Sequence, residues 1–77
     1  MRAVRYATVL GEQEAIVVEV KPWDVHGVGY LDVTVAYRDR SVETARLGRE
    51  SVPEGLSAGD QVLVSRAVNM IVGLRTA

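Results

Sequence analysis

Few side chains in this chain of 77 residues could take part in catalysis, and they are widely spaced. The single histidine, His26, lies two residues from Asp24, and four serines are spread along the chain. No serine stands in a Gly-x-Ser-x-Gly sequence, the turn that exposes the nucleophile of many hydrolases. The residues therefore do not support a Ser-His-Asp triad, and we interpret Asp24 and His26 as solvated turn residues.

Acid–base, metal and dinucleotide chemistry also lack the residues they need. Acid–base catalysis requires two carboxyl groups in different environments, whereas Asp32 stands alone on a polar strand face. The chain has no cysteine, and no third or fourth metal ligand lies near Asp24 and His26. Gly27, Val28 and Gly29 do not begin a dinucleotide fingerprint, because Asp32 stands at the third glycine position. We predict a protein that is not an enzyme and has no cofactor or metal site.

The charge balance gives no general attraction to nucleic acid or to an acidic membrane. Nine basic and ten acidic residues leave a formal net charge of −1. Eight of the nine bases are arginines, whose guanidinium groups bind phosphate and carboxylate well. Codon bias in a GC-rich genome explains the same surplus, and the abundance of Ala, Val and Gly favours this explanation.

Apolar residues make up 48% of the chain, yet phenylalanine is absent and valine dominates. A chain this short buries only about 60% of the surface that it exposes when unfolded. Many valines must then lie half-exposed on a sheet, or some must face a partner. We therefore expect a homo-oligomer or a docking surface for another protein.

No apolar stretch approaches the roughly 20 residues that span a bilayer. No apolar segment of signal-peptide length follows the charged start of the chain, either. The lack of cysteine fits a reducing compartment. These observations predict a soluble, cytoplasmic protein with no membrane partner.

Most apolar residues recur with a period of two, which is typical of β-strands. The predicted strands cover residues 2–10, 15–20, 30–37, 42–47, 61–65 and 70–75. The near-continuous apolar run at 15–20 predicts a central strand, buried on both faces or at an interface. Residues 42–47 could instead form a short helix ended by Gly48, although their β-branched start favours a strand.

Polar and glycine-bearing segments separate these strands. We expect turns at residues 11–14 and 38–41, a loop at 21–29 and a tip at 67–69 where Asn69 adopts a positive φ. Pro22 is expected to end the second strand because proline cannot donate to the ladder. In the connector 49–60, Val52 and Leu56 are expected to hold a turn of 3-10 helix over the open end of the fold.

Five or six short strands cannot leave a flat sheet with long unprotected edges. We therefore predict one all-β domain over residues 1–77, a small, partly closed β-barrel of SH3-like or OB-like kind. The hydrophobic pattern does not fix strand pairing, so both strand orders stay open.

Two features are candidate binding sites. Trp23 either caps one end of the barrel, with its N–H on a carbonyl, or is an exposed anchor for a partner, because tryptophan is enriched at binding hot spots. The second feature is a cluster of arginines near Tyr37 in the sequence, interleaved with acidic residues that nearly cancel their charge. Its members are Arg38, Arg40, Arg46 and Arg49. Tyr37 alternates with Leu31, Val33 and Val35, so a core role is the alternative for this residue.

These features predict a non-enzymatic interaction or assembly module. It would bind a protein, or a second copy of itself, through a sheet face or an edge strand. The alternative is an OB-like binder of single-stranded RNA or DNA that stacks bases on Tyr37 or Trp23 beside the arginines. The third and least favoured hypothesis is an accessory subunit of an enzyme.

Overall fold

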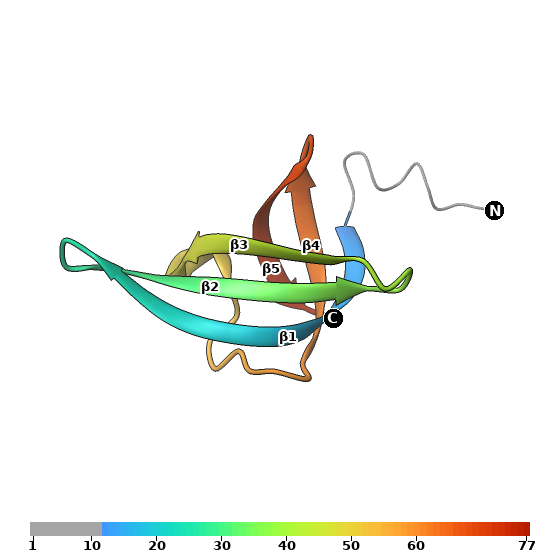
Figure 1. Ribbon diagram of the computed structural model, residues 1–77, viewed down its shortest axis with the longest axis horizontal. Coiled ribbons are helices and arrows are strands. Elements are labelled where there is room, and N and C mark those ends of the chain that lie inside the picture. The colour runs from blue at the N-terminus through green and yellow to red at the C-terminus, as the bar shows by residue number, and fades with distance from the viewer. Residues whose placement is uncertain (1–11) are drawn as a thin grey trace.

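The computed structural model describes residues 12–77, which form five antiparallel strands and one 3-10 turn (Figure 1). The strands are β1 (Glu12–Val25), β2 (Val28–Tyr37), β3 (Val42–Gly48), β4 (Gln61–Ala67) and β5 (Met70–Thr76). The predicted all-β class is confirmed. The strand predicted at residues 2–10 lies outside the described residues.

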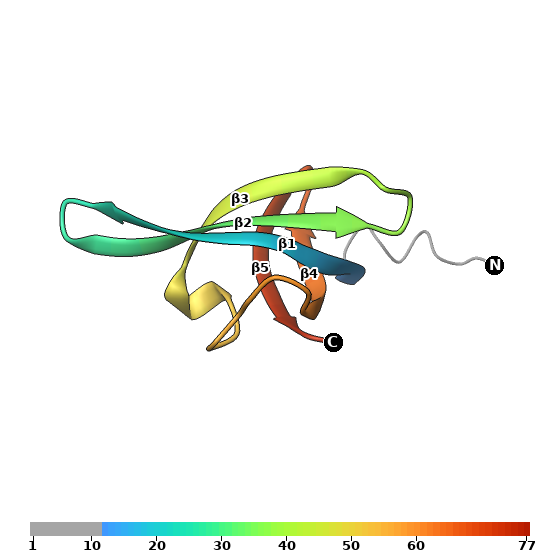
Figure 2. The ribbon, with the colours of Figure 1, turned by 60° about the horizontal axis from the view of Figure 1, so that its bottom comes forward.

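The strands are ordered β3-β2-β1-β4-β5 in a single sheet. The first four strands therefore lie in the spatial order 4-1-2-3 of a Greek key, in which a long connection returns the fourth strand to the side of the first. The sheet curls so that its two edge strands, β3 and β5, approach each other (Figure 2). No ladder joins these edges in the described residues, so the predicted barrel is confirmed only as a curled, open sheet.

Strand β1 is the central strand, and its two ends have different neighbours. Its first residues pair with β4 up to Ile16, while the rest pairs with β2 from Ala15 onward. Val18 is the extra residue of a β-bulge, which bends β1 just after its pairing with β4 ends. The predicted central position is confirmed, but burial on both faces is wrong. Ile16 and Val18 are 46% and 51% exposed because they point away from the core.

The loop predicted at residues 21–29 is instead the end of a long hairpin. β1 runs through Pro22 to Val25, and a two-residue turn at His26 and Gly27 leads into β2. Both turn residues have positive φ, at 51° and 82°, as in the type I′ turns that match strand twist. Pro22 fits because β4 pairs with β1 only up to Ile16, so among residues 12–77 this part of β1 has one neighbouring strand, like an edge strand. Figure 1 shows the hairpin extending beyond the other strands.

The remaining connections agree more closely with the prediction. Residues 42–47 belong to strand β3, which excludes the alternative helix, and residues 38–41 form a turn. The 3-10 turn η1 occupies Arg49–Ser51, and Val52 and Leu56 pack against the core as expected. Two details are wrong: residues 12–14 belong to β1, and Val68, not Asn69, has the positive φ at the last tip.

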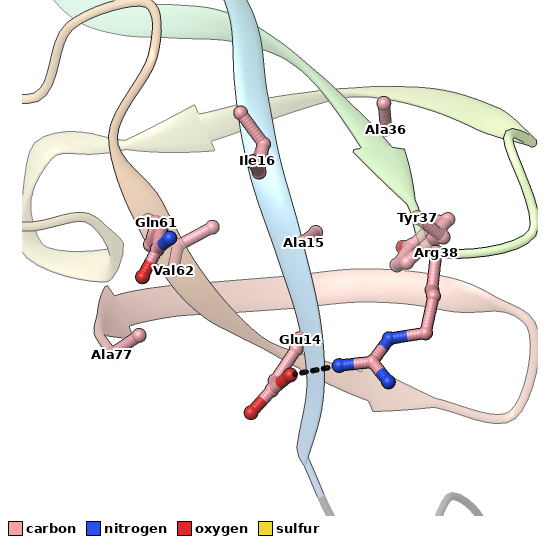
Figure 3. A pocket seen from close by; sticks show the side chains of 9 residues that line it. All are labelled: Glu14, Ala15, Ile16, Ala36, Tyr37, Arg38, Gln61, Val62 and Ala77. Carbon is pink, nitrogen blue, oxygen red and sulfur yellow. Dashed lines mark hydrogen bonds and ion pairs between the residues drawn. The ribbon is translucent and has the colours of Figure 1, made fainter.

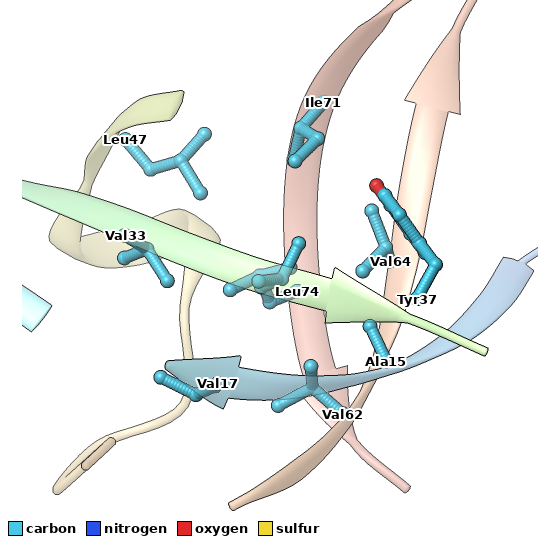
Figure 4. Packing of buried hydrophobic residues seen from close by; sticks show 10 residues of the cluster. Ala15, Val17, Val33, Tyr37, Leu47, Val62, Val64, Ile71 and Leu74 are labelled. Atoms are coloured by element: carbon cyan, nitrogen blue, oxygen red, sulfur yellow. The ribbon is translucent and has the colours of Figure 1, made fainter. Parts of the chain in front are cut away.

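The core lies on the inner side of the curled sheet (Figure 4). Its fully buried side chains are all valines, which come from three of the strands: Val17, Val33, Val35, Val62 and Val64. The core is completed by Ala15, Tyr37, Leu47, Ile71 and Leu74. Within residues 12–77, no helix is long and apolar enough to cross a membrane.

Candidate interaction surface

The candidate site is the side of β1, β2 and β3 that points away from the core, which we call the outer face. Strand pairing arranges its side chains in four rows that run across the strands, between rows of buried residues such as Val33 and Val35. The rows are Trp23–Tyr30, then Lys21–Asp32–Arg46, then Glu19–Thr34–Thr44, and last Ile16–Ala36–Val42.

Trp23 lies in the first row and is 48% exposed. The guanidinium carbon of Arg46, in the second row, lies 4.6 Å from the centroid of its ring. Arg46 also donates two hydrogen bonds to Asp32, at 2.8 and 3.1 Å, and these bonds lower the pKa of that carboxyl. The guanidinium group is therefore held by the Asp32 carboxylate through two of its nitrogens and lies over the Trp23 ring.

The hairpin tip extends this aromatic end of the outer face. Val25 pairs with Val28 directly beyond the Trp23–Tyr30 row. The side chains of Val25 and Val28 therefore lie on the same side as Trp23 and Tyr30, and Val28 is 53% exposed. The tip thus adds exposed apolar side chains to the outer face, on a hairpin that extends past the other strands (Figure 1).

The two middle rows are polar and nearly neutral in total. Two basic and two acidic residues lie in these rows of the outer face, so their formal charges cancel. They are Lys21, Arg46, Asp32 and Glu19. Thr34 and Thr44 share a hydrogen bond of 2.8 Å across β2 and β3. This polar band separates the aromatic end of the outer face from a second apolar end.

A shallow pocket of about 510 Å³ lies at that second end, where β1 passes between β2 and β4 (Figure 3). Ile16 and Ala36 contribute apolar surface to it, and Gln61 and Ala77 line it from the β4 and β5 side. The pocket volume falls within the range of ordinary ligand pockets. At its rim, an Arg38 nitrogen lies 3.1 Å from an oxygen of Glu14.

The predicted cluster of Tyr37 with the arginines does not form one surface. Tyr37 points inward and is only 9% exposed, because strand alternation places it on the same side of β2 as Val33 and Val35. The sequence-based surface that joined Tyr37 to the arginines is therefore wrong.

The four arginines lie in three different places. Arg46 lies on the outer face, and Arg38 and Arg40 lie in the turn beyond the Tyr37 end of β2. Arg49 follows β3 and lies beside the hairpin, where a side chain at Gly29 would meet its Nε at 3.3 Å. Of the six predicted site residues, the structure brings Trp23 and Arg46 together, with the guanidinium carbon of Arg46 over the indole ring.

Tyr37 has a structural role at the open side of the sheet. Its hydroxyl donates a 2.6 Å hydrogen bond to Glu43 of β3, and Arg66 of β4 donates to Glu43 and to the Tyr37 oxygen. The three residues connect β2, β3 and β4 across the interior. Burial and the hydrogen bond to Glu43 raise the pKa of Tyr37 from 10 to about 12, so the hydroxyl remains a donor to a higher pH than in an exposed tyrosine.

Sequence reasoning overlooked the hairpin tip, including Val25, Val28 and the pairing of Tyr30 with Trp23. The cause was the interpretation of residues 21–29 as a loop. A signal was present: Gly27 follows His26 between two segments with alternating apolar residues, and a glycine at the second position of a two-residue turn is typical of hairpins.

The described residues contain no group of three or more His, Cys, Asp or Glu side chains placed to hold a metal ion. No protein family, curated protein or solved structure matches the chain. The function must therefore be argued from the surface itself.

Proposed function

We propose that this protein is a non-enzymatic interaction module that binds a protein partner through the outer face. The observation that carries this proposal is the half-exposed Trp23 with Arg46 stacked on its ring, beside the apolar hairpin tip. Trp, Tyr and Arg are the residues most enriched at binding hot spots. All three types lie next to one another here, as Trp23, Tyr30 and Arg46.

The order of this surface favours binding further. Trp23 lies on a paired strand, and the two hydrogen bonds to Asp32 restrict Arg46 before any partner arrives. A partner therefore loses little free energy to the ordering of these side chains when it docks. Loops would offer the same residue types with a larger entropic cost.

The strand arrangement supports the location of the site. Five strands in a Greek-key order that curl into a partly open barrel are the arrangement of an OB-like fold, which we favour over the SH3-like alternative. OB-folds bind ligands on the face of strands 2 and 3 and at the loop between strands 1 and 2. The outer face and the hairpin tip of this protein occupy those positions.

Single-stranded nucleic acid is the second candidate partner. The pairing of Trp23 with Tyr30 favours it, because aromatic side chains on such a face stack with bases. The charges oppose it, because Glu19 and Asp32 cancel Lys21 and Arg46 on the same face, whereas a nucleic-acid groove keeps one sign. Quenching of Trp23 fluorescence by an oligonucleotide, relieved by added salt, would replace our proposal with this one.

Photo-crosslinking in the producing cell tests the proposal. A photoreactive amino acid replaces Val28 on the hairpin tip or, as a matched control, the exposed Glu54 in the connector. We expect a discrete protein adduct from position 28 and none from position 54. Equal adducts from both positions, or none from position 28, would contradict the proposal.

A further inference from the structure

We propose that the partner of the outer face is a second copy of this chain, docked face to face about a two-fold axis. This inference rests on the proposed function, and it names the partner and the geometry. The axis lies between the two sheets, crosses the strands at right angles and passes over Val33 of β2. The strands of the two copies then run antiparallel, with β1 opposite β1 and β2 opposite β2.

On β2 and β3 the rows of the outer face are spaced evenly about this line, while on β1 the bulge residue Val18 adds one residue between the Glu19 and Ile16 rows. Val33 pairs with Val20 on β1 and Ala45 on β3, so the line crosses all three strands at these positions. Two rows lie on each side of it. Along β2 the rows are two residues apart, or about 6.7 Å, so the Lys21 and Glu19 rows both lie about 3 Å from the line. The Trp23 and Ile16 rows both lie about 10 Å from it.

The charges complement each other under this rotation. Lys21 of one copy faces Glu19 of the second, and the two-fold axis generates the same pair again. Arg46 and Asp32 remain paired within each copy and face the threonine row. A two-fold axis parallel to the strands would instead place Lys21 opposite Arg46, which are like charges. The charge pattern therefore selects the first axis.

The apolar ends complement each other as well. The Trp23 row of one copy faces the Ile16–Ala36–Val42 row of the other, and each of these rows has exposed apolar side chains. The next row outward is the hairpin tip, Val25 with Val28, and its counterpart across the axis is the pocket rim at Glu14 and Arg38. Each copy thus offers one projecting apolar tip and one shallow pocket at equal distances from the axis.

The size of the face sets the strength expected of this dimer. From the hairpin tip to the pocket rim it spans about five row spacings along the strands, or about 33 Å, and about 14 Å across three strands. A flat face of these dimensions would contribute on the order of 500 Å² per copy. The outer face is the convex side of the curled sheet, so the pair lies at or below the small end of specific interfaces. We expect a reversible dimer that dissociates on dilution.

Charge exchange tests this geometry. Glu19→Lys and Lys21→Glu each place like charges opposite each other across the axis, whereas the double exchange restores opposite charges. Sedimentation equilibrium on the purified chain should give a mass that rises toward twice 8.4 kDa with concentration. Each single variant should raise the dimer dissociation constant at least about tenfold, and the double variant should return it close to the original value. Glu54→Lys in the connector controls for net charge and should change nothing.

A chain that stays monomeric at every concentration overturns the dimer. Single variants that associate as well as the original, or a double variant that does not recover, overturn the geometry.

The mass of the adduct from position 28 separates this inference from the proposed function. An adduct of twice the chain mass supports both, and an adduct with a different protein supports the interaction surface but overturns the self-pairing. The absence of an adduct contradicts the proposed function.

Discussion

Arg46 stacks on Trp23 with 4.6 Å between the guanidinium carbon and the ring centroid, although the two residues lie on strands at opposite sides of β2. Trp23 occupies the first row of the outer face and Arg46 the second. The contact therefore crosses β2 diagonally. It joins β1 to β3 on the solvent side of the sheet, which the core side chains do not reach.

Replacement of Trp23 should separate binding from folding. Trp23→Ala is expected to abolish the crosslink from position 28 while lowering the free energy of unfolding by less than about 1 kcal/mol, because half of the side chain is already in water. Leu74→Ala is the matched control in the core and should cost about 2–5 kcal/mol. Urea denaturation measures both values. A loss from Trp23→Ala as large as that from Leu74→Ala would show that Trp23 is a core residue instead.

The pairing of Arg46 with Asp32 should be visible in the titration of the carboxyl. The hydrogen bonds from Arg46 hold the pKa of Asp32 below its ordinary value of 3.8. NMR titration of Asp32 should show a depressed midpoint, and Arg46→Gln should return it toward 3.8. The folded-state pKa is depressed, so this contribution to stability is present above pH 3.8 and is lost as the pH falls further. An unchanged midpoint in Arg46→Gln would contradict the contact.

Removal of the Arg46 side chain should also change the environment of Trp23. The guanidinium covers part of the indole ring, so Arg46→Gln is expected to shift the fluorescence of Trp23 toward longer wavelength and to make it easier to quench. Trp23 is the only tryptophan of the chain, which makes the signal specific. Arg49→Gln is the control, since Arg49 does not stack on Trp23, and it should leave the spectrum as it is.

Tyr37 should give the protein a characteristic loss of stability in alkali. Its pKa rises from the ordinary value of 10 to about 12 in the folded state. A raised pKa stabilises the fold below pH 10, and this contribution disappears as the pH rises from 10 through 12. Tyr37→Phe should remove the slope and cost about 1 kcal/mol at neutral pH, because the hydroxyl loses its hydrogen bonds to Glu43 and from Arg66 while Glu43 stays paired with Arg66.

The phenolate absorption of the original chain minus that of Tyr37→Phe isolates the titration of this residue. A midpoint near 10 in that difference would contradict the buried hydrogen bond to Glu43.

The hairpin turn should respond in opposite directions to two substitutions. Gly27→Ala places a side chain at a φ of 82° and should cost about 1 kcal/mol, although nothing lies within 4 Å of the added methyl. His26→Asn should stabilise the hairpin by a few tenths of a kcal/mol, because asparagine accepts a positive φ better than histidine and Asn-Gly is preferred in type I′ turns. If both substitutions leave stability unchanged, this segment does not form the turn described here.

The strand segments with clear alternation were predictable because a period of two places one side in the core. Residues 30–37 show this: Val33 and Val35 are buried as the alternation requires, and residues 42–47 continue the same sheet. The 3-10 turn was also predictable from its place in the connector. Local patterns of this kind need no knowledge of which strands pair.

The hairpin and the site were not predictable in the same way. Pro22 suggested a strand end, but whether proline disrupts a strand depends on whether that strand has one neighbour or two. The contact of Trp23 with Arg46 depends on strand register, which hydrophobic pattern does not fix. Alternation did predict the inward position of Tyr37, whereas the places of the arginines depend on the turn at 38–41 and on strand register.

The quenching of Trp23 fluorescence by acrylamide across a dilution series tests the central claim most directly, because this residue reports only on the outer face. Our account predicts that Trp23 becomes harder to quench as the concentration rises, over the same range in which the mass of the particle doubles. Glu19→Lys should shift both transitions to higher concentration together. Quenching that stays constant while the mass doubles would show that a different surface joins the two copies and would contradict the account.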